Sequence, residues 1–178
     1  MTSRLKKILC ILLSISLLCG IPVFATGQPA ATDSKALKST PVENCSYTLN
    51  GSNSAQVYGE LTINTSEYYN NDNQRMVKVN YIKVTSAHGL AAFYCSSINI
   101  KLRIVSDAID WHEHDEYKTF SSPGNGTSYY FYPTNNHYHV VNWGGLNSLY
   151  VEATYNTTGG GSFKLKVSRD VEHWEDIV

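Results

Sequence analysis

Residues 98–104 read Ile98-Asn99-Ile100-Lys101-Leu102-Arg103-Ile104, with an apolar residue at every second position. Successive side chains of a β-strand point to opposite faces of a sheet. This stretch therefore predicts a strand that packs one face on a core and turns the other toward water. Other stretches alternate in the same way and predict further strands, over residues 57–63, 149–153 and 163–167.

A longer strand is expected over residues 76–86, with one irregularity. Val77, Val79 and Tyr81 share one parity, whereas Ile82 and Val84 share the other. A β-bulge inserts one extra residue into a strand and reverses the parity beyond it. A bulge near Tyr81 would explain the switch.

Shorter aromatic strands are expected over residues 47–49, 129–132 and 138–143. Asn-rich and Gly-rich turns separate the strands, and no long helical period appears. The pattern predicts an all-β fold, a single antiparallel β-sandwich of about eight or nine short strands. The end of the chain, residues 169–177, is expected to form either a short C-terminal helix or an edge strand.

Residues 1–25 have the features of a secretory signal peptide. Arg4, Lys6 and Lys7 precede an apolar run that is shorter than a membrane span, and small or apolar residues lead up to Ala25. Residues 26–43 are small and polar and show no periodicity. We expect a secreted protein with three parts: a signal peptide (1–25), a flexible N-terminal arm (26–43) and a β-sandwich domain (44–178).

Charge restricts the partners of the exported chain. The predicted signal peptide holds three of the 14 Lys and Arg residues and none of the 15 Asp and Glu residues. The rest of the chain therefore has a net charge of −4 when His is neutral. This balance argues against nucleic acid as a partner. No second apolar stretch approaches membrane length, so no transmembrane segment is expected.

Two cysteines, Cys45 and Cys95, follow the predicted signal peptide. An exported chain with two cysteines most simply pairs them, so a Cys45–Cys95 disulfide is expected. Closing a loop of about 50 residues would contribute roughly 4 kcal/mol. The alternative is a pair of buried free thiols.

Aromatic residues form the first candidate site. Tyrosines occur at both parities of residues 129–132, so one set of rings faces the core and the other faces outward. Exposed Tyr and Trp offer flat apolar faces with a hydrogen-bonding edge, which suits sugars and protein partners. The alternative is that these rings only stabilise the sheet as cross-strand pairs. The candidate ligand-binding residues are Tyr68, Tyr69, Tyr129, Tyr130, Tyr132, Tyr138 and Trp143.

Histidines form the second candidate site, in two His-x-His pairs: His112 with His114, and His137 with His139. Residues i and i+2 of a strand point the same way, so each pair could present two imidazoles to one zinc or copper ion. Alternatively, residues 107–117 form a solvated connection and the other pair are ordinary strand residues. Apart from such a metal, no cofactor is expected.

The spacing of His112, His114 and His137 resembles that of the zinc ligands in the α-type carbonic anhydrases. The resemblance covers these three positions, and this chain is far shorter than the members of that family. It implies a zinc site at these histidines.

Catalytic signatures are weak. The sequence has no Gly-x-Ser-x-Gly motif, and the spacing of its carboxylates selects no pair for sugar hydrolysis from Glu60, Glu67, Asp110 and Glu116. We expect a non-enzymatic binding protein that recognises a carbohydrate, a cell-surface group or a protein ligand through an aromatic face. The alternatives are a metal-binding protein or metalloenzyme, and a secreted toxin-like protein that acts on membranes.

Overall fold

The computed structural model describes residues 39–106, 112–141, 148–169 and 174–176. These residues form strands and connections, and no helix occurs among them. The strands are β1 (Glu43–Ser52), β2 (Val57–Tyr69), β3 (Arg75–His88), β4 (Cys95–Ser106), β5 (His112–Ser121), β6 (Ser128–Phe131), β7 (His139–Val141), β8 (Ser148–Thr157), β9 (Phe163–Arg169) and β10 (Trp174–Asp176). The predicted all-β fold is confirmed.

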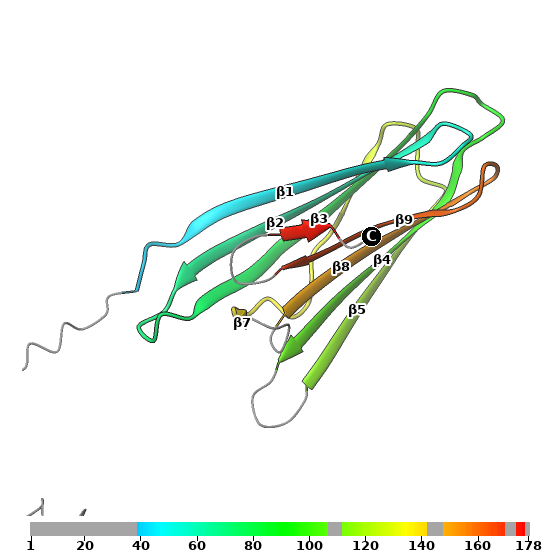
Figure 1. Cartoon of the computed structure of the whole chain (residues 1–178). Coiled ribbons are helices and arrows are strands. Elements are labelled where there is room, and N and C mark those ends of the chain that lie inside the picture. The colour runs from blue at the N-terminus through cyan, green and yellow to red at the C-terminus, as the bar shows by residue number, and fades with distance from the viewer. Residues whose placement is uncertain (1–38, 107–111, 142–147, 170–173, 177–178) are drawn as a thin grey trace, which may run out of the picture. The chain divides into compact units, whose positions relative to one another are not determined.

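The strands form two antiparallel sheets that pack on each other (Figure 1). The first sheet has the order β1-β2-β3-β6, and β7 also pairs with β3. The second has the order β10-β9-β8-β4-β5. Contacts between β1 and β9, β2 and β8, and β3 and β4 join the layers. This arrangement is the predicted antiparallel sandwich.

The core lies between the sheets and follows the alternation seen in the sequence. In β4, Ile98, Ile100, Leu102 and Ile104 are buried, and the residues between them face outward. Full burial of each such side chain contributes roughly 1.5–3 kcal/mol. The first sheet faces them with its own buried apolar residues: Val57, Leu61, Ile63, Val77, Val79, Ile82 and Val84.

The predicted bulge in β3 is confirmed. Tyr81 lies opposite Asn64, and Val79 lies opposite Thr65, so Asn80 is the extra residue. The Asn80 amide donates hydrogen bonds of 2.9 Å to Asn64 Oδ1 and to Ser66 Oγ. The bulge keeps the valines and isoleucine of β3 in the core on both sides of it, and it places Tyr81 on the outer face.

Two segments decide between alternatives that the sequence left open. Residues 112–117 belong to the edge strand β5 rather than to a solvated connection. Most of its inward-facing residues are polar, so its sequence lacks the alternation of apolar and polar residues that would predict a strand. At the end of the chain, β10 pairs with β9 as an edge strand, so the described residues 174–176 take the strand alternative and not the helix.

The predicted disulfide is wrong, because Cys45 and Cys95 are free thiols. Cys45 lies opposite Thr65 in the first sheet. Cys95 begins β4 in the second sheet, and its side chain lies near Ser86, which is opposite Gly59. Six residues of β2 separate Gly59 from Thr65, or roughly 20 Å at the rise of a strand. A disulfide needs Cα atoms within about 7 Å.

The residues just before β1 are tied to the end of β2. The Thr40 amide donates a hydrogen bond of 3.0 Å to the Tyr69 carbonyl, and Thr40 Oγ1 accepts one of 2.7 Å from the Tyr69 amide. Residues 1–38, with the expected signal peptide and most of the expected arm, lie outside the described residues. Within the described part of the chain, no helix is long and apolar enough to cross a membrane.

Candidate ligand-binding face

Three tyrosines gather on the outer face of the first sheet. β6 turns Tyr129 and Phe131 toward the core, which leaves Tyr130, and Tyr132 just beyond the strand, facing outward. Tyr130 and Tyr132 are 45% and 65% exposed, and their rings lie 6.3 Å apart at 18°. Tyr81 meets them edge-on, at 5.5 Å and 6.2 Å. We call Tyr81, Tyr130 and Tyr132 the tyrosine platform.

Polar groups frame the platform. Lys83 lies opposite Tyr130 in the sheet, and its ammonium forms an ion pair of 2.7 Å with Glu60. The hydrogen bond to Glu60 raises the pKa of Lys83, so this group stays charged. The hydroxyls of Thr85 and Ser128 share a hydrogen bond of 3.0 Å in the next row. The platform therefore offers apolar rings next to charged and hydroxyl groups.

A hollow of about 520 Å³ adjoins the platform. It lies between the edge strands β5 and β6, one from each sheet. Ligand sites in proteins are concave and combine apolar surface with a few polar groups, and this hollow combines aromatic rings with charged and hydroxyl groups. Its lining includes Glu116, Tyr117 and Lys118 on one side and Tyr130, Tyr132 and Thr134 on the other.

Glu116 fixes the loop that follows the platform. Its buried carboxylate accepts hydrogen bonds from the Thr134 amide (2.7 Å), the Thr134 hydroxyl (2.9 Å) and the Asn135 amide (2.8 Å). A fourth contact, of 3.2 Å, joins it to His114 Nε2. Burial alone raises the pKa of Glu116, but these hydrogen bonds lower it below its ordinary value. The charged carboxylate thus holds the chain directly after Tyr132.

The other predicted ligand-binding tyrosines lie elsewhere. Tyr129 packs inward on Phe120, with ring centroids 5.1 Å apart, and its hydroxyl accepts a hydrogen bond from the Gly124 amide. Tyr68 and Tyr138 form a separate edge-on pair at 4.9 Å. The remaining two are Tyr69, which lies beside Arg75, and Trp143, which lies outside the described residues.

The structure brings three of the four predicted metal-ligating histidines into one region. Burial lowers the pKa of His139, and the nearby His137 and His114 lower it further. His139 Nε2 is buried and has no hydrogen-bond partner. The side chain of His112 is not described. Among the described side chains, no group of three His, Cys, Asp or Glu residues could hold a metal ion.

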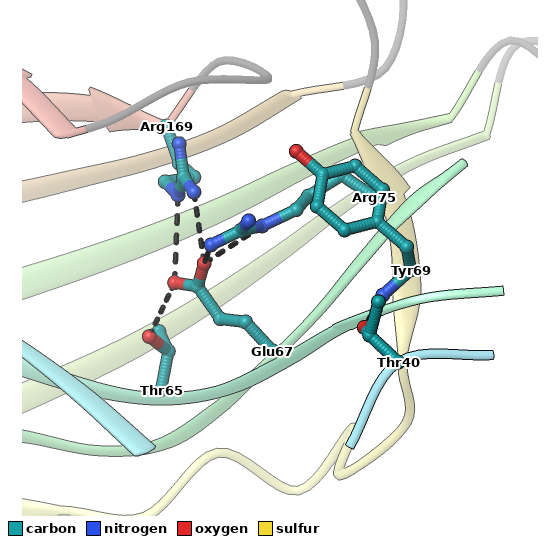
Figure 2. Close-up of polar contacts among 6 residues, drawn as sticks. All are labelled: Thr40, Thr65, Glu67, Tyr69, Arg75 and Arg169. Carbon is teal, nitrogen blue, oxygen red and sulfur yellow. Dashed lines mark hydrogen bonds and ion pairs between the residues drawn. The ribbon is translucent and has the colours of Figure 1, made fainter. Parts of the chain in front are cut away.

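A buried ion cluster between the two sheets was not predicted (Figure 2). Glu67 and Arg169 are 1% and 2% exposed, and Arg169 Nη2 lies 2.8 Å from Glu67 Oε2. Arg75 Nη2 approaches the same oxygen to 2.5 Å, and Thr65 donates a hydrogen bond to the other oxygen. Because Glu67 and Arg169 belong to different sheets, this ion pair joins the two layers.

The sequence did not suggest that Tyr81 belongs to the binding face or that Glu116 holds the loop beside it. The parity switch in residues 76–86 is the signal that could have placed Tyr81 outside. Nothing local could have indicated the role of Glu116, because its partners lie 18 and 19 residues further along the chain. Comparison with protein-family models, curated proteins and solved structures found no match to the chain.

Proposed function

We propose that this chain is an exported, non-enzymatic binding protein and that its tyrosine platform recognises carbohydrate. The single observation that carries the proposal is the gathering of three tyrosines on the outer face of a sheet, beside a hollow of about 520 Å³. Export rests on the signal-like composition of residues 1–25. A β-sandwich by itself does not fix a function.

The chemistry of the platform suits a sugar. A sugar ring has an apolar face of C–H groups and a rim of hydroxyls. Exposed tyrosine rings complement the apolar face, and their own hydroxyls can meet the rim. The ion pair of Lys83 with Glu60 and the hydroxyls of Thr85 and Ser128 add donors and acceptors within the same face.

Two of the candidate carboxylates, Glu67 and Glu116, are poorly suited to act as a general acid. A general acid needs a raised pKa, as in the glycosidases. The hydrogen bonds from Arg169, Thr65 and Arg75 outweigh the effect of burial and lower the pKa of Glu67, and loop amides do the same for Glu116. Both groups are therefore held ionised, in structural roles.

The test is retention on immobilised cellulose, chitin, xylan, starch and mucin glycans, followed by calorimetry with soluble fragments of any glycan that binds. We expect Tyr130→Ala and Tyr132→Ala each to weaken binding at least tenfold, about 1.4 kcal/mol. Tyr94→Ala is the matched control, because Tyr94 is 45% exposed like Tyr130 but lies outside the platform. Circular dichroism would verify folding. Failure of the wild type on every glycan, or an equal loss in the control, would contradict the proposal.

A further inference from the structure

The edges of the two sheets are protected unequally. A free sheet edge can pair with another chain, and proteins block such pairing with short strands, charges or proline. β6, β7 and β10 have four, three and three residues. Pro133 follows β6 closely, and β5 carries Glu113, Asp115, Glu116 and Lys118 within ten residues. These edges all have a blocking feature.

β1 has one such feature, Pro41, which lies two residues before the strand. The strand itself is ten residues long and pairs with β2 at ten consecutive positions without a bulge. Its sequence contains no proline, lysine or arginine, and its one charge is Glu43 at the first position. Among the described strands, β1 pairs with β2 alone. By these criteria β1 is the least protected edge in the described part of the chain.

The inward side chains of β1 are also incompletely covered. Cys45, Tyr47 and Leu49 are half-buried. Their direct partners on β2, which are Thr65, Ile63 and Leu61, have no exposed surface. Tyr47 reaches across to β10, where its hydroxyl donates a hydrogen bond to Asp176. The inward side chains are therefore much more exposed in β1 than in β2. A further strand beside β1 would cover them.

We propose that β1 pairs antiparallel with β1 of a second copy of this chain, across a two-fold axis perpendicular to the sheet. The pairing would join two five-stranded sheets into one continuous sheet. It is compatible with the charges, because Glu43 of one copy faces the uncharged end of the other strand, near Gly51 and Ser52. The interface is isologous, as in most homodimers. This inference does not depend on the proposed function.

The test is sedimentation velocity over a wide range of protein concentration. We expect the wild type to shift from monomer to dimer as concentration rises. In the register that places Glu43 opposite Gly51, residues 46 and 48 of the two copies face each other. The double variant Ser46→Lys/Thr48→Lys then brings like charges together across the two-fold axis, so it should stay monomeric at the highest concentration. The matched control, Thr119→Lys/Ser121→Lys on the edge strand β5, should dimerise like the wild type.

A second measurement needs no variant and therefore applies even if the lysine variant does not fold. Amide hydrogen exchange in β1 should slow as the wild-type concentration rises, and exchange in β5 should not change. A wild type that stays monomeric at every concentration would overturn the proposal. So would a β5 variant that blocks dimerisation as strongly as the β1 variant.

Discussion

Glu67 holds a negative charge in a place that water does not reach. Transferring a carboxylate into a protein interior costs several kcal/mol, and an ion pair offsets this only with good geometry and further hydrogen bonds. Arg169, Arg75 and Thr65 supply both. Although burial alone would raise the pKa of Glu67, the hydrogen bonds from these residues lower it. The carboxylate is therefore ionised whenever the protein is folded at neutral pH.

Replacing Glu67 with Gln should destabilise the fold strongly. The variant keeps the shape of the side chain but leaves two arginines next to each other without their shared carboxylate. Breaking a buried ion pair in this way costs about 3–5 kcal/mol, measured as the free energy of unfolding in denaturant. Glu152→Gln is the control, because its pair with Lys164 is exposed and worth about 0–1 kcal/mol. Equal losses in the two variants would refute the role given to Glu67.

The same carboxylate should make stability depend on acid. Because the pKa of Glu67 is lower in the folded state than its ordinary value of 4.5, its contribution to stability is complete above about pH 4.5. The contribution is lost as the pH falls from there through the folded pKa. Unfolding free energy measured at a series of pH values should decrease below pH 4.5 more steeply in the wild type than in Glu67→Gln. Parallel curves would assign the acid sensitivity to other groups.

At the scale of elements, small residues in one sheet make room for large side chains of the other sheet. Gly51 and Gly59 lie opposite each other in β1 and β2. A Cβ atom at Gly59 would lie 2.7 Å from the ring of Tyr155. That ring is fixed, since it stacks on Phe163 at 4.8 Å and its hydroxyl donates to the Glu60 carbonyl. Glycine at this position allows the second sheet to approach β2.

Gly59→Ala should therefore destabilise the protein by about 1–3 kcal/mol, the usual cost of overpacking a core. Gly89→Ala is the matched control, because a Cβ atom at Gly89 would meet nothing within 4 Å. We expect the control to keep or slightly increase stability, by up to about 1 kcal/mol. Thermal or denaturant unfolding of the two variants measures the difference. If Gly59→Ala left the stability unchanged, the ring of Tyr155 would have to move to make room for the added methyl group.

The strands that could be predicted from the sequence are those in which apolar residues alternate regularly with polar ones. β4 could be predicted because the apolar residues that alternate from Ile98 to Ile104 are the buried ones. The bulge in β3 could be predicted because the apolar parity switches between Val79 and Ile82. β5 could not, because its inward Glu116 is satisfied by amides of a distant loop. The tyrosine platform was half predictable, since the parity of residues 129–132 identifies two aromatic faces but not which one is outside. The Glu67 cluster depends on β9 lying over β2, and nothing local encodes that.

At the scale of the whole molecule, the two sheets are joined by non-covalent contacts alone in the described residues. The core, the Glu67–Arg169 pair and the bond from Tyr47 to Asp176 connect them. Cys45 and Cys95 lie roughly 20 Å apart by strand rise and cannot pair without unfolding.

Reducing agent should therefore leave the unfolding midpoint unchanged. A disulfide closing a loop of about 50 residues would contribute roughly 4 kcal/mol, so its reduction would produce a large shift. Thiol titration supplies the independent check: in denaturant both Cys45 and Cys95 should react without prior reduction. A midpoint that falls in reductant, together with two unreactive thiols, would show that the cysteines are paired after all.

Dimerisation through β1 would also change how the protein binds a surface. A two-fold axis perpendicular to the sheet keeps the outer faces of both copies on the same side, so both tyrosine platforms would face one target. Linking two sites in this way can raise apparent affinity by about 10²–10⁴ without any new contact.

We therefore expect Ser46→Lys/Thr48→Lys to bind a dense immobilised glycan at least tenfold more weakly than the wild type. Its affinity for a short soluble fragment of that glycan should not change, since each platform is intact. If the soluble affinity falls equally, the lysines disturb the platform itself. If neither value falls, each platform acts alone.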